Sequence, residues 1–166
     1  MSETPQTGSP TTRTAPTAPA ATTFLMFEGQ GGQAMTFYVE TLAPYLSGTA
    51  VTRLERRTAE SPEAADNPDL IGTVAAGEFT VAGTPFRVFD SPPGHQFGFT
   101  PSISIFVDLP AGGPDPQAEL DAVDALADEL SSDGGHVLMP ADGYGFSRRF
   151  AWVADRWGVT WQLNCA

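Results

Sequence analysis

The sequence has few basic residues, a single cysteine and no long hydrophobic run. Only 8 Lys and Arg residues stand against 20 Asp and Glu residues, which gives a net charge of −12. Nucleic acids and anionic membrane surfaces need a basic face on their partner, so neither is expected as a partner. Cys165 has no second cysteine to pair with, which excludes an internal disulfide. We interpret Cys165 as a free thiol near a frayed chain end, not as a catalytic nucleophile.

Segments that direct a chain to membranes are also missing. No apolar run approaches the ~20 residues of a membrane-spanning helix. No charged start followed by an apolar segment marks a secretory signal, so we expect a cytoplasmic protein. Residues 1–22 consist almost wholly of Thr, Pro, Ala, Ser and Gly. A segment of this composition cannot bury enough surface to offset its ordering entropy, so a disordered tail is predicted.

The rest of the chain shows one pattern of elements twice. Residues 23–95 predict a strand at 23–27, a helix at 34–42, a strand at 51–57, a loop at 58–69 and strands at 71–81 and 86–90. Residues 96–166 predict a strand at 103–109, a helix capped by Asp115 and ended by Gly134-Gly135, and strands at 136–139, 150–154 and 159–163. This order predicts an α+β fold of two βαβββ modules, 23–95 and 96–166. They would form one structural domain with a cleft between curved sheets and the helices outside.

The last two strands form the most informative segment. Asp155-Arg156-Trp157-Gly158 has the residue preferences of a type I turn between two apolar runs. Thr160, Gln162 and Asn164 then share one strand face, opposite Val159, Trp161 and Leu163. Together with Phe37-Tyr38 and Pro101–Val107, the segment Trp152–Gln162 resembles the PhnB-like branch of the vicinal oxygen chelate superfamily. That superfamily includes glyoxalase I, extradiol dioxygenases and bleomycin resistance proteins, and the branch is labelled 3-demethylubiquinone-9 3-methyltransferase-like.

The resemblance extends over about residues 23–164 and implies a half-barrel of paired modules, a homodimer and a ligand cavity. Metal-dependent relatives carry two histidines and two glutamates at positions that fall here on Thr23, Ser102, Gln162 and Arg87. Two hydroxyls, an amide and a guanidinium are poor ligands for a catalytic divalent metal. His95 and His136 lie outside this set. We therefore expect no metal and no cofactor, and glyoxalase chemistry is disfavoured.

A nucleotide cofactor is not expected either. Gly29-x-Gly31-Gly32 follows a strand and precedes a helix, but it lacks the spacing and the later acidic partner of a dinucleotide-binding fingerprint. The methyltransferase label therefore has no support in the residues.

Strand alternation predicts a mostly apolar cavity with a few polar anchors. Its predicted wall is Thr23, Leu25, Phe27, Arg87, Phe89, Ser102, Ser104, Phe106, Trp152, Thr160 and Gln162, whereas Phe24, Met26, Ile103, Ile105, Val107, Trp161 and Leu163 are expected to pack under the helices. Aromatic residues of the wall could also simply fill the barrel.

Three functions stay open for this cavity. The first is the binding of a small aromatic or carbonyl-bearing molecule that Arg87 and Gln162 orient. The second is a metal-independent lyase or isomerase, in which Arg87 stabilises an enolate-like anion and Glu28, Asp90 or His95 moves a proton. The third is drug sequestration of the bleomycin-resistance type, with which the acidic charge is compatible. No catalytic residue is identified, because no base is paired with an orienting partner.

Overall fold

The first sheet is built from the N-terminal half of the chain. The computed structural model describes residues 20–166, so the predicted tail lies outside the described residues except for its last three positions. Its first elements are β1 (Thr23–Phe27), α1 (Gly31–Leu42), β2 (Ala50–Arg56), α2 (Pro62–Asp66), the 3₁₀ helix η1 (Pro68–Leu70), β3 (Val74–Val81) and β4 (Thr84–Asp90). The strand order is β1-β4-β3-β2, with β1 parallel to β4 and the other pairs antiparallel.

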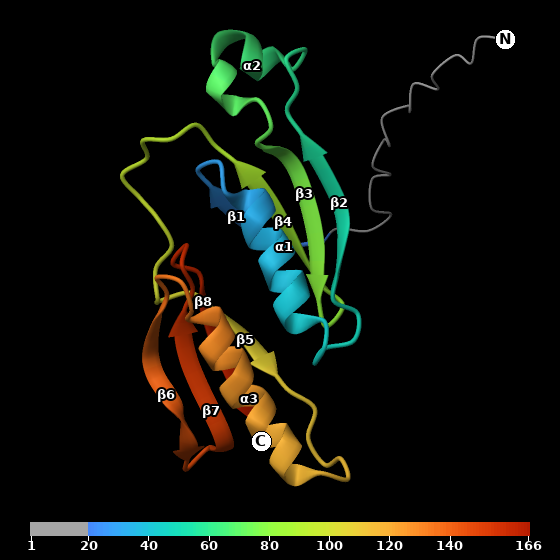
Figure 1. Ribbon diagram of the computed structural model, residues 1–166, viewed down its shortest axis with the longest axis vertical. Coiled ribbons are helices and arrows are strands. Elements are labelled where there is room, and N and C mark those ends of the chain that lie inside the picture. The colour runs from blue at the N-terminus through green and yellow to red at the C-terminus, as the bar shows by residue number, and fades with distance from the viewer. Residues whose placement is uncertain (1–19) are drawn as a thin grey trace, which may run out of the picture.

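The second sheet repeats this topology. Its elements are β5 (Ser104–Asp108), α3 (Pro116–Leu130), β6 (His136–Tyr144), β7 (Ser147–Ala154) and β8 (Thr160–Cys165), and the strand order is β5-β8-β7-β6. In Figure 1 the two modules follow each other along the long axis, each with its helix on the viewer's side of its sheet. The predicted α+β fold of two βαβββ modules is confirmed, and the two sheets of the described residues do not close into a barrel. Within residues 20–166, no helix is long and apolar enough to cross a membrane.

One hydrophobic core connects the modules. Tyr38 of α1 and Phe79 of β3 belong to the same buried cluster as Val123 of α3 and Trp161 and Leu163 of β8. Each helix therefore covers one face of its sheet, and the opposite face of each sheet, which we call the open face, is turned away from the helix. Neither half has to stabilise its own small core, which agrees with the marginal size of each module.

The start of α1 is fixed by a buried carboxylate. Asp90, at the end of β4, is fully buried and its Oδ1 accepts hydrogen bonds from the backbone N–H groups of Gly29 (3.1 Å) and Gly31 (2.7 Å). Its Oδ2 accepts a third from the N–H of Val74 (2.7 Å). A Cβ on Gly31 would lie 2.6 Å from Val88 Cγ1, so only glycine fits here. Two N–H groups of the glycine-rich turn, those of Gly29 and Gly31, therefore anchor the helix, and these two are not free to bind a phosphate.

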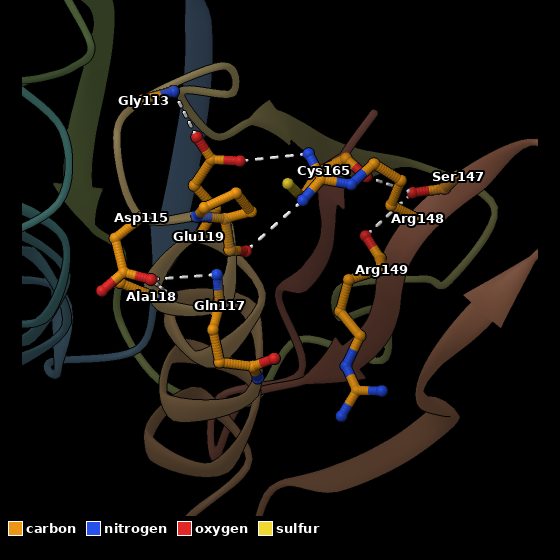
Figure 2. A network of polar contacts seen from close by, with 10 residues as sticks. Gly113, Asp115, Gln117, Ala118, Glu119, Ser147, Arg148, Arg149 and Cys165 are labelled. Atoms are coloured by element: carbon orange, nitrogen blue, oxygen red, sulfur yellow. Dashed lines mark hydrogen bonds and ion pairs between the residues drawn. The ribbon is translucent and has the colours of Figure 1, made fainter.

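The start of α3 carries the predicted cap. Asp115 accepts hydrogen bonds from the N–H groups of Gln117 and Ala118, and Pro116 occupies the first helical position. Figure 2 shows the hydrogen-bond network beside it. In this network Glu119 Oε1 accepts a hydrogen bond from the Gly113 N–H (2.6 Å), and Oε2 accepts one from Arg148 Nη1 (3.0 Å). The Gly113 amide, and then Arg148, lower the pKa of the Glu119 carboxyl below its ordinary value. These contacts connect α3 to β7 at the end of the module.

Three local predictions differ from the structure. The segment 58–69 contains α2 and η1 instead of an open loop, and a proline begins each of these short helices. The strands at 136–139 and 150–154 extend toward each other into a hairpin at Gly145-Phe146. Pro140 is unfavourable in a strand because it has no N–H to donate, so the extension was not expected. β6 is, however, an edge strand with register shifts, where a missing N–H is tolerated. Cys165 is fully buried in β8, where it pairs with Arg149, and is not at a frayed end.

Candidate functional site

The main cavity lies where the two modules meet. It has a volume of about 500 Å³, within the range of small-molecule sites, and its walls come from β1 and β4 of the first sheet, β5 and β8 of the second, and the segment 91–103 that connects them. We call it the junction cavity. Four aromatic rings line it, those of Phe24, Phe86, Phe99 and Phe106. No charged side chain of the described residues lines it.

Hydroxyl groups supply most of the side-chain polarity of the junction cavity. They belong to Thr23, Thr100, Ser104 and Thr160. Thr160 Oγ1 donates to the carbonyl of Ile103 (2.9 Å) and lies 2.9 Å from Ser104 Oγ. Because the single Thr160 proton is used on Ile103, Ser104 gives its own proton to Thr160 or to the Pro101 carbonyl (3.4 Å) and keeps its lone pairs. Ser104 can therefore accept a hydrogen bond from a ligand.

The structure distributes the eleven residues of the predicted wall over several places. Five line the junction cavity, namely Thr23, Leu25, Ser104, Phe106 and Thr160. Arg87 and Phe89 lie on the open face of the first sheet, since Val88 between them packs toward α1. Trp152 and Gln162 are cross-strand partners on the open face of the second sheet. Phe27 is buried in the core against Phe99 and Trp157, and Ser102 is exposed in the connecting segment, with its Oγ 3.0 Å from Thr100 Oγ1.

The residues of β1 also lie on other sides of the sheet than the alternation predicted. Leu25 and Phe27 are buried in the core, whereas Phe24 is 57% exposed. Ile103, which was also expected under a helix, is 76% exposed at the rim of the junction cavity. Large apolar side chains occupy both faces of β1, so the pattern alone could not identify the inner face.

Sequence reasoning did not identify the contribution of the connecting segment. Gly98, Phe99 and Thr100 line the junction cavity, and the Phe99 ring also packs in a tilted arrangement against Phe27, with 5.1 Å between ring centres. The signal was present as Phe99 in a stretch otherwise rich in glycine and proline, whereas the nearby Phe97 is 65% exposed. Large apolar residues in such a segment indicate that it packs against the domain.

The four positions that the resemblance compares with metal ligands lie in different parts of the structure. Thr23 lines the junction cavity, Ser102 lies in the connecting segment, and Gln162 and Arg87 lie on the open faces of different sheets. Two hydroxyls, an amide and a guanidinium do not fit a catalytic divalent cation. Among residues 20–166, no group of three or more His, Cys, Asp and Glu side chains is arranged to hold a metal ion.

The side chains of the three candidate general bases, Glu28, Asp90 and His95, all contact other groups of the protein. Asp90 is occupied by the three backbone N–H groups described above. Glu28 and His95 lie beside a smaller hollow of about 180 Å³ that adjoins the junction cavity at Phe24 and Phe99. There Glu28 Oε1 accepts the backbone N–H of His95 (2.8 Å), and the imidazole stacks on Phe97. None of the three lines the junction cavity.

A second buried carboxylate connects the modules. Asp155 Oδ2 accepts hydrogen bonds from the Tyr38 hydroxyl (2.7 Å) on α1 and from Trp161 Nε1 (3.1 Å) on β8. Its Oδ1 accepts the N–H groups of Trp157 (2.9 Å) and Val159 (3.0 Å) in the predicted turn. Burial raises the pKa of Asp155 above its ordinary value, against the lowering effect of these hydrogen bonds. Burial, and then the Asp155 charge, raise the pKa of Tyr38 well above its ordinary value.

Comparison with known proteins agrees with this architecture. A family model described as 3-demethylubiquinone-9 3-methyltransferase matches residues 19–164. A solved structure from Bacillus cereus, described as a putative 3-demethylubiquinone-9 3-methyltransferase, PhnB protein, is 32% identical; the match covers 89% of this chain and 100% of that chain with a TM-score of 0.71.

More distant structures share the fold alone. A protein from Pseudomonas aeruginosa is 24% identical over 89% of this chain and 98% of its own, with a TM-score of 0.65. A glyoxalase/bleomycin resistance protein from Albidiferax ferrireducens is 10% identical over 87% of this chain and 97% of its own, with a TM-score of 0.52. No curated protein matches the chain.

Proposed function

The chain belongs to the family described as 3-demethylubiquinone-9 3-methyltransferase and has a glyoxalase-like fold, and we propose that it binds a small, uncharged aromatic or carbonyl-bearing molecule in the junction cavity without a metal. The supporting observation is a cavity of about 500 Å³ lined by four phenylalanine rings and four hydroxyls, with no charged side chain among them. Aromatic walls favour a planar ligand through stacking, and a few hydroxyls can orient a carbonyl.

The same observation disfavours the two alternatives at this cavity. A cationic drug of the bleomycin type would need a carboxylate or another anion to balance its charge, and none lines the cavity. A metal-independent enolisation would need Arg87 and a base beside the bound carbonyl. Arg87, Glu28, Asp90 and His95 all lie outside the cavity wall.

Substitution of one aromatic wall residue tests this proposal. Phe106→Ala is expected to weaken the binding of 1,4-naphthoquinone or acetophenone at least tenfold, because it removes a ring of the cavity wall. Isothermal titration with the protein before and after EDTA treatment measures the affinity and its independence of metal. Phe146→Ala is the matched control, since Phe146 is similarly exposed but lies on the β6–β7 hairpin. The proposal fails if neither probe binds, if both variants bind alike, or if EDTA abolishes binding.

We also propose that the protein forms a homodimer. Support comes from the rim of the junction cavity, where Phe24, Ile103 and Phe106 are 57%, 76% and 53% exposed. Exposed apolar side chains gathered in one place are typical of contact surfaces between subunits. Light scattering on the purified protein is expected to give twice the mass of one chain, and a monomeric mass at micromolar concentration would contradict this.

A further inference from the structure

A second cavity lies on the helix side of the molecule, between α1 and α3. It has a volume of about 370 Å³, which is enough for a small organic ligand. Both helices lie on the same side of the sheets, toward the viewer in Figure 1. We call this cavity the helix groove, and it shares no residue with the junction cavity. Its wall consists of Phe37, Glu40, Thr41, Tyr45, Ala125, Leu126 and Glu129.

The helix groove contains two carboxylates at places where a helix disfavours them. Glu40 lies in the last turn of α1 and Glu129 in the last turn of α3, and neither helix has a basic residue in its last turn. The C-terminal end of a helix carries partial negative charge, so a carboxylate there is unfavourable. Among the residues that the structure describes, neither carboxylate accepts a hydrogen bond or forms an ion pair. The two helix ends and the two side chains therefore give the groove a negative potential.

The basic residues nearby are already paired with other carboxylates. The Arg156 guanidinium lies over the Phe37 ring, with Cζ 4.7 Å from the ring centre, but its Nη2 is 2.9 Å from Asp133 Oδ2. Arg149 reaches α3 from β7 and binds Asp124 there. Neither arginine belongs to the wall of the groove. The negative charge of the wall is therefore left for a ligand to balance.

The aromatic part of the wall suits a cation as well. Tyr45 follows α1 and is 38% exposed. Within residues 20–166, its ring packs on no other aromatic ring and its hydroxyl makes no hydrogen bond. Phe37 already holds one cation, the Arg156 guanidinium, over its ring. An aromatic face attracts a cation through its quadrupole, and the carboxylates attract the same cation through their charge.

We propose that the helix groove binds a small quaternary ammonium cation. Its methyl groups would pack against Tyr45 and Ala125, and its charge would lie between Glu40 and Glu129. Ca²⁺ and Mg²⁺ fit this wall poorly, because they need six or more oxygen ligands in a defined geometry. A quaternary ammonium has no hydrogen-bond donor, so aromatic faces and nearby negative charge are sufficient to hold it. The proposal does not depend on the function proposed for the junction cavity.

Choline and its neutral carbon isostere 3,3-dimethyl-1-butanol test the charge requirement. In isothermal titration at low salt, choline is expected to bind about tenfold more tightly or better, since only choline interacts with the carboxylates and the ring through charge. Glu40→Gln and Glu129→Gln should each weaken choline binding about fivefold or more. Glu63→Gln is the matched control and should bind choline like the unmodified protein, because Glu63 is exposed on α2 and lies outside this wall.

The aromatic requirement has its own pair of variants. Tyr45→Ala keeps every charge but removes the ring, and it should weaken choline binding about fivefold. Tyr45→Phe keeps the ring and should bind choline like the unmodified protein, since the hydroxyl is not needed.

Thermal unfolding gives a readout that does not rely on affinity. Without ligand, the Glu40→Gln, Glu129→Gln double variant should unfold at a higher temperature than the unmodified protein, because two unfavourable charges at helix ends are removed. Excess choline should raise the unfolding temperature of the unmodified protein and leave that of the double variant unchanged.

Several results would overturn the proposal. They are equal affinities for choline and 3,3-dimethyl-1-butanol, no detectable binding of choline, equal effects of Glu40→Gln and Glu63→Gln, and equal affinities of Tyr45→Ala and Tyr45→Phe. Phe106→Ala should leave choline binding unchanged, so failure here and failure of the proposed function at the junction cavity are distinguishable.

Discussion

Replacing Asp155 by alanine is expected to lower the free energy of unfolding by about 4 kcal/mol. The carboxylate is only 2% exposed and accepts four hydrogen bonds, from Tyr38, Trp161 and the N–H groups of Trp157 and Val159. Each buried donor left without its acceptor costs about 1 kcal/mol or more. The hydrogen bond that connects Tyr38 on α1 to the turn between β7 and β8 is lost at the same time. Urea unfolding followed by tryptophan fluorescence measures the change.

Asp128→Ala is the matched control for this prediction. Asp128 is exposed on α3, and its side chain makes no hydrogen bond or ion pair with another described residue, so its removal should change the unfolding free energy by less than about 0.5 kcal/mol. Equal unfolding midpoints for Asp155→Ala and the unmodified protein would show that the buried carboxylate does not hold the modules together.

The same contact predicts a dependence of stability on alkaline pH. In the unfolded chain Tyr38 loses its proton near pH 10, whereas burial and the Asp155 charge raise its pKa in the folded protein. The folded state then binds more protons than the unfolded state above this pH, so stability falls as the pH rises. Tyr38→Phe should reduce this fall while leaving the slope near pH 7 unchanged.

Replacing Asp90 by alanine is expected to lower the free energy of unfolding by about 3 kcal/mol. Three buried backbone N–H groups, those of Gly29, Gly31 and Val74, lose their acceptor, and each costs about 1 kcal/mol or more. These groups belong to the start of α1 and the start of β3, so the loss should loosen both elements at one end of the first sheet.

Hydrogen exchange distinguishes this local effect from general destabilisation. The amides of Gly29, Gly31 and Val74 should exchange faster in Asp90→Ala relative to those of β7 and β8, beyond the change that lower global stability causes. Asp66→Ala, at the exposed end of α2, is the control and should alter neither pattern. Uniform acceleration across both modules would contradict the anchoring role of Asp90.

Most of the secondary structure followed from local signals that act within a few residues. The Asp115 cap, the Asp155–Gly158 turn and the apolar stripe of α3 depend on backbone geometry close to each residue, so the sequence was enough to place them. The hairpin at Gly145-Phe146 was missed because Pro140 and Gly143 are unfavourable in most strands, and only the edge position of β6 makes them acceptable.

The site could be predicted only in part, because it depends on contacts between distant segments. Alternation correctly grouped Arg87 with Phe89 and Ser104 with Phe106, since residues two apart share a strand face. It could not decide which face of β1 is buried, because Phe24 and Leu25 are equally apolar. The partners of Asp155 were also out of reach, since Tyr38 is 117 residues away in the chain. Predicting that Phe99 lines the junction cavity would have required knowing where the connecting segment folds back.

The junction cavity has walls from both modules, and this has a thermodynamic consequence. A ligand in that cavity can bind only while the modules are docked, so by mass action it shifts the population toward the docked state. At a ligand concentration a hundred times the dissociation constant, this linkage contributes about 2.7 kcal/mol. Saturation of the cavity would therefore protect the Asp155 contact from opening, even though the ligand does not touch it.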